Sequence, residues 1–134
     1  MPSNAVLEAA LDEANTAPSA ESRARVCREF LRAWVCIGCR EPVNVAGPLP
    51  EDLTVPMLTA TGPEGKVLLV FTSEEQLRKR SSAAHPVWLR AQTVQKVGER
   101  DGLAGVVINP AGVWVFLEKA EIATTPVEVR HRRM

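Results

Sequence analysis

Apolar residues in the first part of the chain recur at the spacing of one helical face. The first such segment runs from Asn4 to Ala14, with Asn4 as a candidate N-cap. A second follows Ser19, another candidate N-cap, and its apolar face extends from Val26 to Ile37 opposite a face rich in arginine. The pattern predicts two amphipathic helices, the second of which packs on a β-sheet.

The middle of the chain changes to the pattern of strands and turns. Prolines alternate with apolar residues over 42–58, which favours short strands broken by turns. Thr61–Gly65 has the composition of a hairpin turn, and the continuous apolar run Lys66–Phe71 predicts a central strand buried on both faces. Thr72 and Ser73 then begin two overlapping capping boxes, which predict a short helix over Ser73–Arg80.

A loop, a short strand and a further helix are expected next. Ser81–Pro86 has the composition of a loop, and Val87–Leu89 is a candidate edge strand. Apolar residues return at helical spacing from Ala91 to Val97. Asp101-Gly102-Leu103 matches a helix end with glycine in the left-handed conformation, so the helix is expected to stop there.

The last part of the chain has the pattern of a hairpin followed by a helix. Val106–Ile108 and Val113–Leu117 are strand candidates joined by the turn Asn109-Pro110-Ala111-Gly112, and Glu118–Ala123 begins a last helix. Together the elements predict an α/β (α+β) fold. We expect a single compact domain with a mixed sheet of about five strands, flanked by the N-terminal helices and by short later helices.

Composition narrows the class of protein. A chain of 134 residues with 46% hydrophobic content is the size of one domain, which we place at residues 1–126, with a basic tail at 127–134 expected to be disordered. Lys+Arg and Asp+Glu both number 16, so no net field favours nucleic acid. The absence of a signal pattern or a membrane-length apolar run, and an odd count of three cysteines, favour the cytoplasm.

The order and spacing of two motifs resemble a known family. The first motif is Val-Phe-Thr-Ser-Glu-Glu-Gln-Leu at 70–77, and the second is Gly-x-x-Gly-Val-Val-Ile-Asn-Pro-Ala-Gly at 102–112. Both follow the segment Arg-Glu-Phe-Leu-Arg at 28–32, which lies on the second predicted helix. In this order they resemble the N-terminal domain of the bacterial SseB family over roughly Asn4 to Ile122. The resemblance implies a compact α/β domain without an established catalytic centre, associated with binding or regulatory roles.

The pair Cys36-Ile-Gly-Cys39 has an evident chemical interpretation. Such a pair forms a redox dithiol or half of a zinc site. Redox dithiols lie at helix N-termini, whereas this pair is expected where a helix ends and a strand begins. Zinc would need further ligands, for which Cys27 with His85 or His131 are candidates. We favour structural thiols and keep zinc as an alternative.

Other polar residues are explained by local structure. The hydroxyls of Thr72 and Ser73 could face an anion, but plain helix capping suffices because neither a glycine-rich approach nor a lysine accompanies them. His85 is expected to be a solvated loop residue. Glu74 and Glu75 are expected to be acids of a helical first turn rather than a catalytic pair.

The three tryptophans differ in context. Trp34 lies on the predicted apolar helix face and Trp114 in a predicted strand, so both are expected in the core. Trp88 follows a His-Pro pair on the candidate edge strand. It is either a core residue or an anchor for a partner or a second copy of the chain.

We therefore expect a non-catalytic protein-interaction or regulatory module of a bacterial cytoplasmic protein. It is expected to use no cofactor, to bind a protein partner or itself as a homodimer, and to bind neither nucleic acid nor membrane. The alternatives are a zinc-stabilised module using Cys36 and Cys39 and, less favoured, a small enzyme. The residues expected at the contact surface combine aromatic and turn positions: Phe71, Thr72, Ser73, Trp88, Asn109, Pro110 and Gly112.

Overall fold

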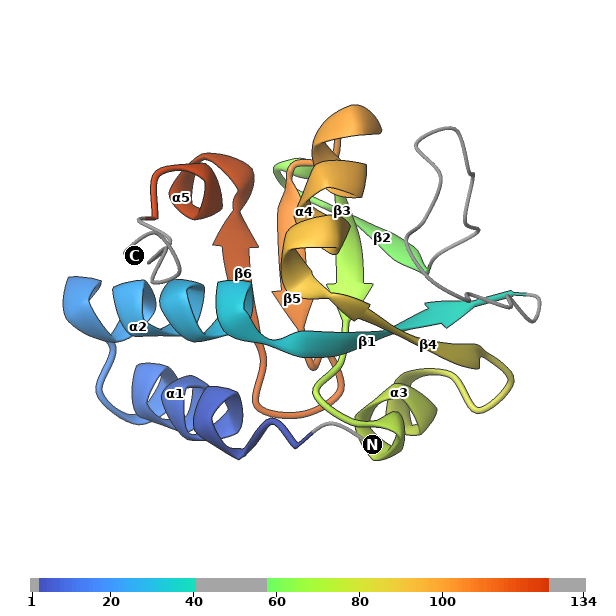
Figure 1. Cartoon of the computed structure of the whole chain (residues 1–134), viewed down its shortest axis with the longest axis horizontal. Coiled ribbons are helices and arrows are strands. Elements are labelled where there is room, and N and C mark those ends of the chain that lie inside the picture. Colours follow the sequence, from blue (N-terminus) through green and yellow to red (C-terminus); the bar gives the residue numbers. More distant parts are fainter. Residues whose placement is uncertain (1–2, 41–57, 126–134) are drawn as a thin grey trace, which may run out of the picture.

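A computed structural model describes residues 3–40 and 58–125 of the chain (Figure 1). Within these ranges it contains five helices and six strands. The helices are α1 (Ala5–Thr16), α2 (Ala20–Arg32), α3 (Glu74–Arg80), α4 (Ala91–Arg100) and α5 (Lys119–Ala123). The strands are β1 (Trp34–Cys39), β2 (Thr59–Gly62), β3 (Gly65–Val70), β4 (His85–Arg90), β5 (Gly105–Ile108) and β6 (Val115–Glu118).

The predicted fold class is confirmed, since helices and strands build one compact α+β domain. Two expectations fall outside the described ranges: all but the last residue of the strands expected over 42–58, and the tail at 127–134. No helix in the described part of the chain combines the length and the apolar character needed to cross a membrane.

The strands form two sheets where the sequence predicts one. Four strands pair in the order β2-β3-β5-β6, with β3 and β5 parallel and the outer pairs antiparallel. Strands β1 and β4 form a separate antiparallel ribbon. An isolated bridge between Cys36 and Phe71 links the ribbon to the end of β3. The division arises because β1 crosses β3 there instead of running alongside it (Figure 1).

Strand β3 lies at the centre of the core, as its continuous apolar sequence predicts. Leu68 and Val70 belong to the larger hydrophobic cluster, together with residues of α1, α2 and α4. Val67 and Leu69 belong to a second cluster on the other face. The strand is therefore buried on both faces, and the hairpin predicted at its start joins it to β2.

Helix α2 ends earlier than its apolar spacing predicts. It stops at Arg32, and the chain continues as β1, in which Val35 and Ile37 face the larger cluster. Alternating β-branched residues favour a strand, and β4 pairs with this strand over its full length. Trp34 is 42% exposed, and the guanidinium of Arg90 lies 5.0 Å from its ring centroid. The expected place of Trp34 in the core is therefore wrong.

Most predicted helix ends are confirmed. The hydroxyls of Ser19 and Ser73 accept hydrogen bonds from the backbone N–H groups three residues further on. Gly102 adopts φ +70 after α4, as its predicted left-handed position requires. Asn4 and Thr72 do not cap helices with their side chains, because both enter the site described below.

A charged pair ties α2 to the end of β6 and to α5. Arg23 Nε and Nη2 donate to the two carboxylate oxygens of Glu121 over 2.9 and 2.8 Å. The same Nη2 donates to the carbonyl oxygen of Phe116 over 2.6 Å. The hydrogen bond from Arg23 lowers the pKa of the Glu121 carboxyl below its ordinary value.

This pair predicts a pH-dependent part of the stability. Because the pKa of Glu121 is lower in the folded chain, its stabilisation is present above the unfolded-state pKa and is lost as pH falls through the folded value. We expect Glu121→Gln to cost about 1 kcal/mol at pH 7, because both groups are partly solvated, and less at pH 3, which lies below the unfolded-state pKa. Urea unfolding at both pH values measures this, and an equal cost at both would contradict the assignment.

Candidate functional site

The ends of β3 and β5 are joined by two hydrogen bonds between Thr72 and Asn109. The Thr72 N–H donates to Asn109 Oδ1 over 2.9 Å, and Asn109 Nδ2 donates to Thr72 Oγ1 over 3.0 Å. Both residues are buried. Because β3 and β5 are parallel, their carboxyl ends lie at the same edge of the sheet. The pair therefore fixes the two loops that leave that edge.

Helix α1 is attached to this pair through Asn4 and Glu8. The Thr72 hydroxyl donates to Glu8 Oε2 over 2.7 Å. Asn4 Nδ2 donates to the carbonyl oxygens of Thr72 and Trp34, both over 2.9 Å. These tertiary contacts replace the side-chain capping that the sequence predicts for Asn4 and Thr72. We call Asn4, Glu8, Thr72 and Asn109 the junction network.

Asn109 also begins the predicted turn. Its backbone has φ +55, in the left-handed region that asparagine tolerates better than most residues. The Gly112 N–H donates to the Asn109 carbonyl oxygen over 2.9 Å, which closes the turn. Asparagine suits this position because its backbone accepts the turn while both ends of its amide hold Thr72.

A groove with a volume of about 260 Å³ lies beside the junction network. It is formed between α1, α3 and the β5–β6 loop, which meet at the lower edge of the view in Figure 1. Its lining residues are Glu8, Leu11, Asp12, Gln76, Asn109 and Val113. The two charged residues among them are both acidic. We call this feature the junction groove.

Two exposed apolar residues border the junction groove. Val113 lines it and is 44% exposed, and the adjacent Trp114 is 55% exposed. Asn15 Nδ2 of α1 donates to the Trp114 carbonyl oxygen over 3.3 Å. The expected place of Trp114 in the core is wrong, because β6 begins only at Val115. We call the junction groove together with Val113 and Trp114 the loop face.

Five of the seven residues expected at the contact surface lie in or beside the loop face. Thr72 and Asn109 are buried, so their side chains position the loops rather than meet solvent. The others differ in exposure: Ser73 and Pro110 are half-buried and Gly112 is exposed. Their contact with a partner stays a prediction.

Phe71 and Trp88 lie elsewhere: Phe71 is buried in the second hydrophobic cluster, and Trp88 packs against the same cluster. Trp88 is half-buried in β4, and its indole N–H donates to Glu74 Oε2 over 3.4 Å. Glu74 and the groove residue Gln76 are two positions apart on α3, and residues at that spacing do not face the same side of a helix. The structure therefore does not bring Trp88 to the junction groove.

A family model described as SseB protein N-terminal domain matches residues 7–124. The chain belongs to the SseB family. The match covers most of the 134 residues and confirms the predicted resemblance. All residues that line the junction groove fall within the matched part of this SseB domain. No curated protein and no solved structure matches the chain.

The paired cysteines of this SseB domain lie inside β1, not at the helix–strand boundary. Cys36 belongs to the second hydrophobic cluster and Cys39 to the larger one, on opposite sides of the strand. Residues three apart in a strand point to opposite faces, so the two thiols cannot bind one ion or form a disulfide while the strand is intact. The described residues contain no group of three metal-ligand side chains. The orientation of the two thiols therefore argues against a zinc site that uses both, and the candidate ligand His131 lies outside the described residues.

All three thiols are expected to be unreactive in the folded protein. Cys27, Cys36 and Cys39 are buried, and burial raises the pKa of Cys36 to about 12 and the pKa values of the other two above the ordinary value. Titration with a disulfide reagent at pH 8 should detect no thiol in the native chain and three in denaturant. Rapid labelling of the native chain would contradict this arrangement.

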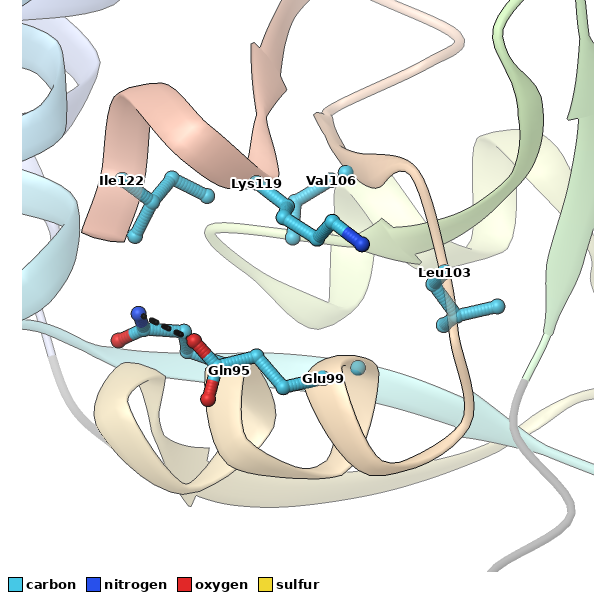
Figure 2. Close-up of a pocket in the computed structure, with 8 residues that line it drawn as sticks. Gln95, Glu99, Leu103, Val106, Lys119 and Ile122 are labelled. Atoms are coloured by element: carbon cyan, nitrogen blue, oxygen red, sulfur yellow. Dashed lines mark hydrogen bonds between the residues drawn. The ribbon is translucent and has the colours of Figure 1, made fainter. Parts of the chain in front are cut away.

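A second crevice of the SseB domain lies between α4 and α5 (Figure 2). Lys119 and Ile122 line it from α5, and Gln95 and Glu99, which are hydrogen-bonded to each other, line it from α4. Its volume of about 20 Å³ is that of a water site rather than of a substrate site. His85 lies away from it, exposed at the start of β4. We base the functional proposal on the loop face because it combines a groove with exposed apolar residues.

Proposed function

We propose that this SseB domain is a non-catalytic protein-binding module of the bacterial cytoplasm, and that the loop face is its contact surface. The observation that carries the proposal is the exposed pair Val113 and Trp114 beside a groove. Exposed tryptophan is enriched among residues that dominate binding energy at protein interfaces. A regulatory role would follow from what the partner does.

The surroundings of this pair suit a binding surface. The β5–β6 loop is held at its start by Asn109 and near its end by the hydrogen bond from Asn15 to the Trp114 carbonyl. A loop fixed at both ends loses little conformational freedom on binding, which favours affinity. The partner is either a different protein or a second copy of this chain.

A small enzyme is the weaker alternative. The residues that line the junction groove supply carboxylates, amides and apolar groups, and among them stands no histidine, thiol, serine or lysine. The carboxylates of Glu8 and Asp12 could act as acid or base, but both are exposed and lack the desolvated setting that tunes a catalytic carboxyl group. These side chains are better suited to a binding surface than to a catalytic site.

Capture from the native cell lysate tests the proposal. The tagged chain should retain a specific protein, and Trp114→Ser should reduce the recovery of that protein about tenfold or more, as expected for an interface anchor. Trp34→Ser is the matched control, because Trp34 is also exposed but lies at the start of β1. An untagged second copy among the captured proteins would identify a homodimer.

The comparison between the two variants decides the outcome. Both should show native circular dichroism, since neither side chain is buried. Recovery that is unaffected by Trp114→Ser, or reduced equally by Trp34→Ser, would remove the loop face as the contact surface.

A further inference from the structure

We propose that the protein bound at the loop face is a second copy of this chain, and that a two-fold axis relates the two copies. The inference rests on the proposed binding function and names its partner. Two features of the surface carry it: exposed apolar residues at its centre, and unpaired charges of opposite sign on the two helices that flank it.

The β5–β6 loop lies between α1 and α3 and contacts both (Figure 1). On the α1 side, Asn15 Nδ2 donates to the Trp114 carbonyl oxygen. On the α3 side, Gly112 packs against Gln76, because a Cβ added at Gly112 would lie 2.7 Å from Gln76 Oε1. The exposed side chains of Val113 and Trp114 therefore form an apolar centre with one helix on each side.

The α1 side of this centre is acidic. Glu8 and Asp12 line the junction groove from α1 and are exposed. Helix α1 contains no lysine or arginine, and neither carboxylate takes part in an ion pair between described residues. The negative charge of this side is therefore not compensated by its neighbours.

The α3 side carries an unpaired cation. Helix α3 ends in Arg78, Lys79 and Arg80, and the first two each have a glutamate four positions earlier, on the same side of the helix. Arg80 instead follows Gln76 by four positions, so it lies on the side of α3 that Gln76 presents to the loop. Arg80 is exposed and forms no ion pair between described residues. The two sides of the apolar centre therefore differ in the sign of their charge.

A surface with this arrangement is complementary to itself. A two-fold axis that lies in the contact plane and runs between α1 and α3 puts α1 of each copy opposite α3 of the other. Each acidic side then meets a basic side, and Val113 and Trp114 of the two copies pack together at the centre. A different partner would have to carry the reverse charge pattern, which this chain already supplies. The net charge of the chain is zero at pH 7, so no overall repulsion opposes self-association.

Sedimentation equilibrium of the purified chain tests the proposal. Between about 1 μM and about 1 mM, the apparent mass should rise from that of one chain to that of two and no further. Sodium chloride should weaken the association, because it screens the attraction between exposed charges. Trp114→Ser should weaken it about tenfold or more, whereas Trp34→Ser, at an exposed tryptophan outside the loop face, should leave it unchanged.

Charge reversal tests the orientation of the two copies. Asp12→Lys and Arg80→Glu should each weaken self-association several-fold, because each gives the facing helices like charges. Mixing the two variants should restore association, since α1 of either variant then faces an α3 of opposite charge. Lys96→Glu, at an exposed cation of α4 outside the loop face, is the matched control and should change nothing. All of these side chains are exposed, so the variants should keep the native circular dichroism.

Each other outcome overturns the proposal. It fails if the chain remains a monomer throughout the series, if Trp34→Ser weakens association as much as Trp114→Ser, or if the mixed charge variants associate no better than each does alone. Lysate capture that still depends on Trp114 would then preserve the binding function and assign it to a different protein. Loss of both results would remove both.

Discussion

Replacing Asn109 with alanine is expected to lower the free energy of unfolding by about 3 kcal/mol. The Thr72 N–H would lose its acceptor inside the protein, and Thr72 Oγ1 would lose a donor. Alanine would also have to hold φ at +55, which costs a residue with a Cβ roughly 1 kcal/mol. Urea unfolding of the two chains measures the difference.

A glycine at the same position separates the two causes. Asn109→Gly also removes the hydrogen bonds to Thr72 but accepts the left-handed backbone, so its cost should be smaller, about 2 kcal/mol. If both variants cost less than about 0.5 kcal/mol, the junction network does not hold the loops as described.

Replacing Gly105 with alanine is expected to cost about 3 kcal/mol or more and to disturb the pairing of β5 with β6. A Cβ at this position would overlap the carbonyl oxygen of Leu117 and lie 3.1 Å from the Cα of Glu118. Both are backbone atoms of the neighbouring strand, so the clash cannot be relieved by a side-chain rotation. The destabilisation should appear as a lower midpoint of thermal unfolding and as weaker protection of the β6 amides from hydrogen exchange.

Gly98 provides the matched control within the same domain. It lies inside α4, and the nearest atom to an added Cβ would be Leu103 Cδ1 at 4.0 Å, an ordinary contact. Gly98→Ala should therefore stabilise the chain by about 0.5 kcal/mol or more, through the higher helix propensity of alanine. If Gly98→Ala lowered the stability as much as Gly105→Ala, the close approach of the β6 backbone would not be the cause of the destabilisation at Gly105.

Much of the fold could be predicted because local chemistry and tertiary structure agree. Ser19 and Ser73 cap helices, and Gly102 ends one, because each satisfies a purely local need. The boundary between α2 and β1 could not be placed in this way. Ile37 continues the helical face that begins at Val26, but with Val35 it also fits alternate positions of a strand, and only the pairing with β4 decides between them.

Less of the candidate site could be predicted, because it joins residues far apart in the sequence. The turn at Asn109 was visible, but its hydrogen bonds with Thr72 span 37 positions and depend on the parallel pairing of β3 with β5. Glu8 and Asp12 occupy polar positions of the first predicted helix, where exposed charged residues are ordinary and indicate no site. One available signal was missed: Val115 and Leu117 alternate inward, which puts Trp114 on the opposite side.

The fold explains why the loop face can be both exposed and ordered. Trp114 and Val113 meet solvent, but the loop that carries them starts at a buried asparagine and is bonded to α1. Exposing two large apolar residues to water is unfavourable, and a partner that covers them would remove this unfavourable exposure. The stability of the junction network and the binding at the loop face are therefore linked in this account.

Site-specific photo-crosslinking tests the central claim most directly. Benzoylphenylalanine is placed at position 114 of the chain in one sample and at position 34 in another, since both native tryptophans are exposed. We expect illumination in native cells to link position 114, but not position 34, to a specific protein or to a second copy of the chain. No crosslink from position 114, or the same products from both positions, would contradict a binding function at the loop face.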